Sequence, residues 1–140
     1  MNLKFYLIFI FLFILAFTAG YSLAATRISQ QSGDWSSSAT WGGVIPAAND
    51  DIIVSAGTIV RLNTSLSSSL SYHNLDIESG GSLIVGIDKV TLRLAGNLRN
   101  NGILNLWQSS TLQGDIVLYA NSFWSGNGTW NLSTINVQSN

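Results

Sequence analysis

Two acidic residues, Asp76 and Glu78, are the clearest candidates for chemistry in this sequence. They lie two positions apart, with the apolar residues Leu75 and Ile77 alternating with them. Because successive side chains of a β-strand point to opposite faces, both carboxylates are predicted to face outward, about 7 Å apart. Such a pair is suited to Ca²⁺ ligation or to acid–base catalysis. Only two acids are present, which favours the alternative of ordinary surface charge.

Three aromatic residues form a second candidate site. Trp107, Tyr119 and Phe123 each neighbour a residue that is predicted to point inward, so strand parity turns their rings outward. An aromatic ring packs its apolar face on the C–H groups of a sugar, and the three residues are therefore candidates for glycan binding. The alternative is that these rings shield a lateral loop or contact further coils of the protein.

A third group of charged residues lies near the start of the regular sequence. Arg61 occupies a position that is apolar in the equivalent segments described below, which predicts that its side chain points inward. A buried guanidinium requires a carboxylate partner, and we expect Asp50 or Asp51 to supply it. We interpret this group as a structural clasp, and a binding or catalytic arginine is the lesser alternative.

The remaining reactive residue types do not form a recognisable site. His73 is the only histidine and the chain has no cysteine, so neither a zinc site nor a disulfide framework is predicted. Serines are plentiful, but no Gly-x-Ser-x-Gly elbow and no phosphate-binding glycine loop is present. The sequence therefore predicts no catalytic residue, no metal and no cofactor.

The first 24 residues have the features of a secretory signal peptide. Residues 1–4 are weakly basic, Phe5–Phe17 is an unbroken apolar run of 13 residues, and Ser22 and Ala24 are small residues before a cleavage point. A membrane span needs roughly 20 apolar residues, so an uncleaved anchor is the weaker alternative. We expect a secreted or cell-surface protein without stable membrane insertion after cleavage.

The charge balance of the rest of the chain narrows the choice of partners. After residue 25 there are five basic and seven acidic side chains, a formal charge of −2. Without a basic stripe to neutralise phosphates, binding to nucleic acid or to an anionic membrane surface is not expected. The roughly 115 residues suffice for one domain, which must be held together by packing and backbone hydrogen bonds.

A repeat is the most informative feature of the sequence. Residues 53–61, 77–85, 98–106 and 124–132 align without gaps, and each segment has a glycine flanked by apolar residues at fixed distances. The alternation of apolar residues predicts short strands. The shared glycines predict corners where φ is positive or where the next turn of chain passes close. These corner glycines are Gly57, Gly81, Gly102 and Gly128.

Further strands are predicted at residues 89–94, 115–119 and 134–137. Short strands that bend at glycines and recur every 20-odd residues predict an all-β fold, a parallel β-helix (β-solenoid) of about four coils. Right-handedness is expected from the general preference of parallel crossovers. A shift of 26 residues pairs Leu92 with Leu118 and Leu104 with Trp130. It predicts Trp124 and Trp130 as core residues and Asn105 and Asn131 as an outward amide row.

The two ends of the predicted solenoid differ. Residues 26–52 are interpreted as an N-terminal cap and first strand, and residues 53–140 as the coils. Aromatic residues and proline are suited to covering the backbone groups that a first coil leaves unpaired. The residues expected to form this plug are Trp35, Trp41, Val44, Ile45 and Pro46. The C-terminal end shows no such cap, and we expect the coils to continue beyond residue 140 in a longer protein.

The cap and the coils that follow it resemble the start of the eight-glycine domain. The resemblance covers roughly residues 30–106 and is carried by Gly33-Asp34-Trp35, Ala39-Thr40-Trp41, Gly42-Gly43, Pro46, Asp50-Asp51, Ile53, Gly57, Gly81-Ser82-Leu83 and Gly96-Asn97-Leu98. It implies an extracellular β-helix module like those that begin bacterial surface and secreted, adhesin-type proteins. Some animal members belong to proteins tied to hyaluronan breakdown. The family is defined by glycines and packing residues, so the resemblance implies no catalytic residue.

Three functions remain open on this sequence. The first is a non-enzymatic scaffold or adhesin module that contacts extracellular polysaccharide or cell-surface glycans. The second is a fragment of a polysaccharide lyase or hydrolase whose active site lies outside this chain. The third is a protein that self-associates through its C-terminal edge. A solenoid fold alone does not choose among them.

Overall fold

The computed structural model describes residues 24–64, 71–87, 90–107, 114–119, 124–132 and 134–138. Within them the chain is almost entirely β-structure, with one short 3₁₀ helix, η1 (Ser38–Trp41). Every pairing between named strands is parallel. In this part of the chain, no helix is long and apolar enough to cross a membrane.

Three parallel sheets form the walls of the molecule. The first wall contains β1 (Thr26–Ile28), β3 (Asp51–Val54), β5 (Leu75–Ile77), β8 (Leu98–Asn100) and β11 (Trp124–Ser125). The second wall contains β2 (Gly33–Asp34), β4 (Ile59–Leu62), β6 (Ser82–Val85), β9 (Ile103–Asn105) and β12 (Thr129–Asn131). The third wall contains β7 (Val90–Leu94), β10 (Gly114–Tyr119) and β13 (Thr134–Gln138).

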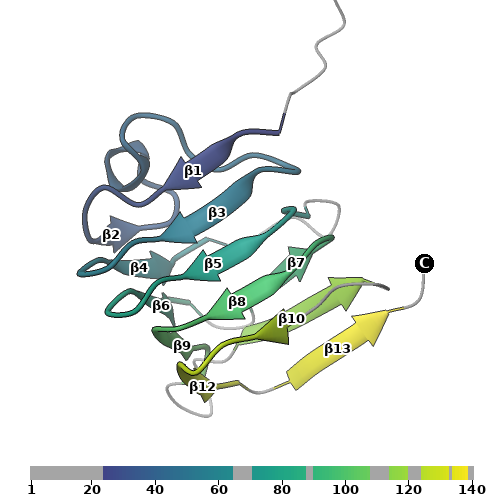
Figure 1. Ribbon diagram of the computed structural model, residues 1–140. Helices are drawn as coiled ribbons and strands as arrows, with labels where there is room; N and C mark the ends of the chain where they lie inside the picture. Colours follow the sequence, from purple (N-terminus) through teal and green to yellow (C-terminus); the bar gives the residue numbers. More distant parts are fainter. Residues whose placement is uncertain are drawn as a thin grey trace, which may run out of the picture.

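Successive strands pass from wall to wall, so the chain winds as a β-solenoid of about four turns. Figure 1 shows the strands of each wall stacked one above another along the solenoid. Side chains alternate between a buried interior and an outer face, and the buried positions fall into register between coils. Leu75 pairs with Leu98, and Leu83 pairs with Leu104. The predicted fold class is confirmed.

The predicted alignment of the repeats is wrong in two places. Ile59 pairs with Ser82, so the first repeat is displaced by one residue from the predicted alignment. On the third wall Leu92 pairs with Ile116, two residues away from the predicted pairing with Leu118. The corners differ in length from coil to coil by one or two residues. Buried residues of one strand therefore still pair with buried residues of the next coil, although the spacing along the sequence varies.

Gly81, Gly102 and Gly128 occupy equivalent positions before β6, β9 and β12. A Cβ atom on Gly102 would lie 2.2 Å from the carbonyl oxygen of Gly81, and one on Gly128 would lie 2.4 Å from that of Gly102. Close approach of neighbouring coils therefore explains these three glycines. Gly57 has φ of 76° and lies beside Gly80 rather than Gly81. Its backbone N–H donates to the carbonyl of Gly80 at 3.0 Å.

The asparagines that precede the corner glycines, Asn100, Asn101 and Asn127, do not adopt the left-handed conformation. Among the described residues, Asn49 is the only non-glycine residue with positive φ. Asn100 instead points into the interior, where it is fully buried. Its side chain donates to the carbonyl of Thr129 (2.9 Å) and accepts from the backbone N–H of Gly102 (3.1 Å). The buried amide therefore has hydrogen-bond partners for both its nitrogen and its oxygen.

The N-terminal cap is built on two buried tryptophans. The rings of Trp35 and Trp41 pack edge to face at 5.0 Å, and Trp35 contacts Tyr72 in the same way at 5.2 Å. Pro46, which follows Trp41 in the same loop, is also buried, but Val44 and Ile45 are exposed. The prediction that Val44 and Ile45 belong to the plug is therefore wrong, because the cap loop turns both side chains to solvent.

The last described coil leaves its interior uncovered. Trp124 is in register with the buried Leu98, yet 54% of its surface is exposed, so the prediction of a core residue is wrong for Trp124. Trp130 is partly buried and packs edge to face against Trp124 at 5.9 Å. The register is as predicted, but within the described residues no further layer lies over these rings.

Candidate functional site

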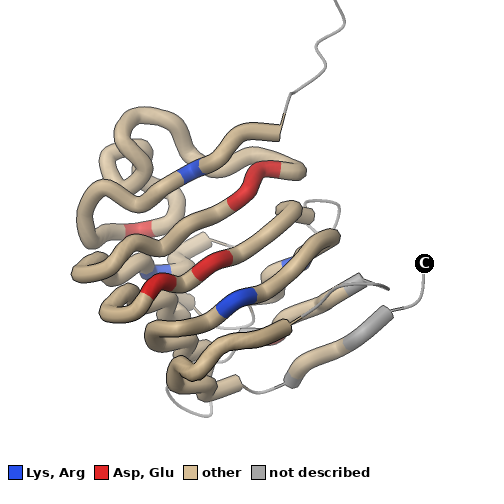
Figure 2. Tube along the Cα trace, viewed as in Figure 1, with Lys and Arg blue, Asp and Glu red and all other residues tan. Residues whose placement is uncertain are grey.

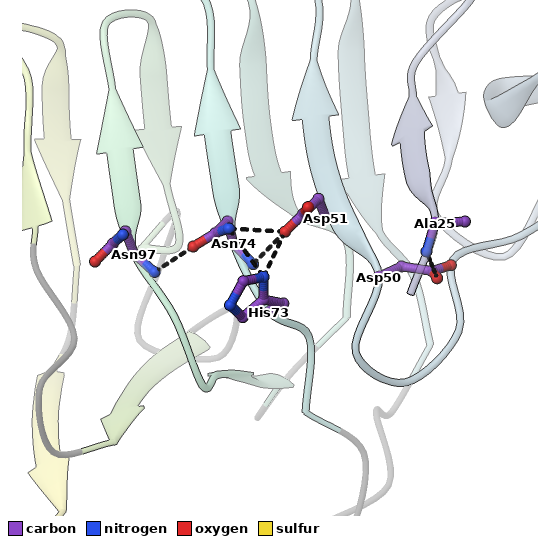
Figure 3. Close-up of polar contacts among 6 residues, drawn as sticks. All are labelled: Ala25, Asp50, Asp51, His73, Asn74 and Asn97. Atoms are coloured by element: carbon purple, nitrogen blue, oxygen red, sulfur yellow. Dashed lines mark hydrogen bonds and ion pairs between the residues drawn. The ribbon is translucent and has the colours of Figure 1, made fainter. Parts of the chain in front are cut away.

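A row of polar side chains crosses the start of the first-wall strands. Asp51, Asn74 and Asn97 are in equivalent positions in three successive coils, as Figure 3 shows. Asn74 donates through Nδ2 to Asp51 Oδ1 at 2.8 Å, and its own Oδ1 accepts from the backbone N–H of Asn97 at 2.6 Å. His73 Nδ1 lies 2.8 Å from Asp51 Oδ1. The geometry is that of a ladder that ties coils together.

Asp76 and Glu78 lie on the outer side of the first wall, as strand parity predicted. Asp76 forms an ion pair with Arg99 of the next coil, an arginine that the sequence interpretation did not connect to it. The hydrogen bond to Asp76 raises the pKa of the Arg99 guanidinium, and the negative charge of Asp76 acts in the same direction. Glu78 is exposed and accepts from the backbone N–H of Ala56 at 3.1 Å.

These carboxylates do not assemble into a metal-binding cluster. Among the described residues, no group of three or more His, Cys, Asp or Glu side chains is placed to hold a metal ion. Asp76 is already paired with a cation, and Glu78 is held by a backbone donor. The arrangement therefore favours contacts between coils over Ca²⁺ ligation or acid–base catalysis at this pair.

Asp50 is the most enclosed charged group in the described part of the chain. Only 1% of it is exposed, and it accepts from Ala25 N through Oδ1 and from Ala47 N and Arg27 Nε through Oδ2, each at 2.9 Å. Burial by itself disfavours the charged form, but these hydrogen bonds and the charge of Arg27 together hold the pKa of Asp50 below its ordinary value. The sequence interpretation missed Arg27 because nothing local marks this pairing.

Arg61 does not join Asp50 or Asp51, and its side chain does not point inward. The one-residue displacement of the first repeat places Arg61 beside Ile84 on the outer face of the second wall. Its guanidinium pairs with Asp34 at 3.0 Å, and 52% of the side chain is exposed. The aliphatic part of Arg61 lies over Gly86, where a Cβ atom would be 2.4 Å from Arg61 Cγ.

An exposed tryptophan and two amides form the second candidate surface. Trp107 follows β9 and is 42% exposed. Asn131 donates through Nδ2 to Asn105 Oδ1 at 3.1 Å and to the carbonyl of Trp107 at 2.9 Å, which confirms the predicted amide row. We call Trp107, Asn105 and Asn131 the Trp107 surface. Of the other predicted aromatic residues, the Tyr119 side chain and Phe123 lie outside the described residues.

The charged residues are distributed unevenly over the walls. Figure 2 shows basic positions on β1 and β8 of the first wall and acidic positions on β3 and β5 between them. These strands carry Arg27, Asp51, Asp76 and Arg99. On the second wall, the described strands have one charged pair, Asp34 with Arg61, near the capped end. The strands β6, β9 and β12 are uncharged, so the Trp107 surface is electrically neutral.

The fold and these surfaces define a parallel β-solenoid module with an N-terminal cap. A family model for the G8 domain matches residues 40–133, which is more than half of the chain. The protein belongs to the G8 domain family, and the resemblance to the eight-glycine domain is confirmed. G8 domains are in general non-catalytic modules. Comparison with curated proteins and with solved structures gave no match.

Proposed function

We propose that this protein is a secreted or cell-surface solenoid module that acts as a non-enzymatic scaffold and contacts glycans through the Trp107 surface. The observation that carries the proposal is the exposed Trp107 ring beside two outward amides on a regular parallel sheet. An indole face packs against the C–H groups of a sugar ring, while amide groups exchange hydrogen bonds with its hydroxyls.

The polar groups of the Trp107 surface leave capacity for a ligand. Asn105 Oδ1 accepts hydrogen bonds from Asn131 Nδ2 and from the backbone N–H of Trp107. The described residues supply no partner for Asn105 Nδ2 or for Asn131 Oδ1, which leaves one donor and one acceptor facing outward. A sugar with adjacent hydroxyls satisfies both, since each hydroxyl donates and accepts.

The charge of the second wall favours a neutral glycan over a polyanion. The strands that carry the Trp107 surface are uncharged, and Arg61 is already paired with Asp34. A uronic-acid polymer would need cations to replace the water around its carboxylates. A scaffold role is supported by the first wall, where Asp76 with Arg99 and Asp51 with His73 link neighbouring coils.

Binding to immobilised polysaccharides tests this proposal. Trp107→Ala is expected to weaken binding to a neutral glycan about tenfold, or about 1.4 kcal/mol, because the stacking surface is lost. Trp107→Phe should retain part of the affinity, and Val44→Ala, which shortens an exposed apolar side chain in the cap loop, should leave it unchanged.

Three results would count against this proposal. Equal binding by the Trp107→Ala and Val44→Ala variants would remove the Trp107 surface from recognition. New reducing or unsaturated ends after incubation with hyaluronan or pectin would show that the chain is an enzyme. A preference for these acidic polymers over neutral ones would contradict the argument from charge.

A further inference from the structure

Ala25 is the residue that becomes the N-terminus if residues 1–24 are removed as a signal peptide. Its backbone nitrogen lies 2.9 Å from Asp50 Oδ1, a contact drawn in Figure 3. Asp50 is buried and is held on its other oxygen by Arg27 and Ala47. A carboxylate with almost no exposure is therefore positioned at the predicted cleavage point.

We infer that cleavage between Ala24 and Ala25 creates an ion pair between the new α-ammonium group and Asp50, which we call the N-terminal latch. A signal peptidase hydrolyses the peptide bond with one water. The water oxygen becomes part of the Ala24 carboxylate, and its two protons complete the ammonium group of Ala25. This inference rests on the secretion that the proposed function includes, and it does not depend on glycan binding.

The charges around Asp50 favour a second cation at this position. Two carboxylates, those of Asp50 and the adjacent Asp51, lie near one guanidinium, that of Arg27. The guanidinium binds Oδ2 of Asp50. Among the described residues, Asp50 Oδ1 accepts a hydrogen bond only from the Ala25 nitrogen. Converting that nitrogen from an amide to an ammonium group keeps the hydrogen bond and adds a charge, and hydrogen bonds between charged groups are about twice as strong as neutral ones.

The structure also supplies a matched control. Ala24 is exposed, and Ala25 continues directly into β1. A chain that begins at Ala24 therefore fits the same fold and still has the Ala25 N–H to donate. Its ammonium group, however, lies one residue further out, about 3.5 Å along an extended chain. The two chains differ in the position of one positive charge.

The pH range of the effect follows from the direction of the shift. Pairing with Asp50 raises the pKa of the Ala25 ammonium above the value of about 7.7–8.0 for an unfolded N-terminus. The stabilisation is therefore complete below that value and is lost as the pH rises through the folded pKa. Arg27, Asp51 and His73 are common to both chains. Burial raises the pKa of Tyr72, which faces the same region, to about 12, so it remains neutral in this range.

The first step of the test is to express the full 140-residue chain in a secreting host and to read the mature N-terminus by intact mass. The second step compares chemical unfolding of the chain that begins at Ala25 with that of the chain that begins at Ala24, each released from a cleavable leader. At pH 7 the unfolding constant of the Ala25 form should be about fivefold smaller. The difference should vanish at high pH and in an Asp50→Asn background.

Each outcome decides one part of the inference. A mature N-terminus at another position overturns the latch alone, because the chain is still secreted. An uncleaved leader on a chain that stays inside the host overturns both the latch and the proposed secretion. Cleavage after Ala24 with equal stability of the two chains at pH 7 overturns the latch alone and leaves the proposed function standing. A difference that persists at high pH shows that the charge is not its cause, and this also overturns the latch. If Asp50→Asn does not fold, the comparison of the two unmutated chains is sufficient.

Discussion

At the scale of residues, most buried polar groups have a partner from a neighbouring coil, and Asp76 Oδ1 is the exception among the described residues. Asp50 binds Arg27 of β1, Ser29 Oγ lies 2.6 Å from Thr58 Oγ1, and Asn100 bonds the backbone of the following coil. An unpaired polar group in this interior would be costly, because no water replaces the missing bond. The polar contacts therefore fix which coils lie beside each other.

Tyr72 shows how one such contact becomes a pH effect. Its hydroxyl accepts from Trp35 Nε1 at 3.3 Å under the cap. Burial raises its pKa from 10.0 to about 12, because the phenolate form is poorly solvated there. Below pH 10 the hydroxyl is protonated in both folded and unfolded chains, so it contributes no pH dependence. Between pH 10 and about 12 the unfolded chain ionises first, and stability falls.

We expect this alkaline loss to amount to about 2–3 kcal/mol and to disappear in Tyr72→Phe. The variant should be less stable than the unmodified protein at neutral pH by about 1–3 kcal/mol, since Trp35 Nε1 loses its partner. Urea unfolding measured across this pH range checks both statements. Parallel pH profiles for the two proteins would mean that Tyr72 does not cause the alkaline transition.

At the scale of elements, the glycine corners determine how closely the coils approach. Gly81, Gly102 and Gly128 precede equivalent strands of the second wall, and each allows the carbonyl of the coil above to pass. Gly57 meets a different need, since its φ of 76° is unfavourable for other residues. The same corner in successive coils therefore uses glycine for two separate reasons.

Gly102→Ala should destabilise the fold by about 3 kcal/mol, because its Cβ atom would overlap backbone oxygens of Gly81 and Glu78 that cannot move independently of their strands. Asn101→Ala at the same corner is the control. Its side chain is only partly buried, and the change should cost within about 0.5 kcal/mol. Thermal unfolding of the two variants gives the comparison, and similar losses in both would refute the close-approach explanation.

At the scale of the whole molecule, each coil is stabilised mainly by its neighbours. The strands of one coil are two to six residues long and bury their apolar faces only when another coil stacks on them. The first coil is covered by Trp35 and Trp41, whereas Trp124 in the last described coil is largely exposed. Stability should therefore be unequal along the solenoid axis.

Hydrogen exchange followed by mass spectrometry should show this gradient. The amides of β8 and β9 are expected to exchange more slowly than those of β11 and β12, because the latter have a neighbouring strand on one side only within the described residues. A self-associating protein should lose the gradient as its concentration is raised. Equal protection of all four strands in dilute solution would show that the solenoid opens only as a single unit.

The sequence predicted the short strands, the inward and outward parity of the second and third repeats and the glycine corners, whereas the predicted parity of the first repeat was wrong. These features depend on local rules: side chains alternate along a strand, and a corner tolerates few residues. The same parity placed Asp76, Glu78 and Trp107 on the outside. The cap tryptophans were predicted from their bulk and their position ahead of the first regular strand. The G8 match agrees with this interpretation of the repeat.

The register between coils, by contrast, was decided only by the tertiary structure. The one-residue displacement of the first repeat turned Arg61 from a predicted core position to an exposed pair with Asp34. The two partners that the sequence did not reveal, Arg27 for Asp50 and Arg99 for Asp76, are each 23 residues from the group they bind. Local preferences make side chains alternate along a strand. The length of each corner decides which residues of the strand face inward and which neighbours they meet, and that length depends on the packing of the whole stack.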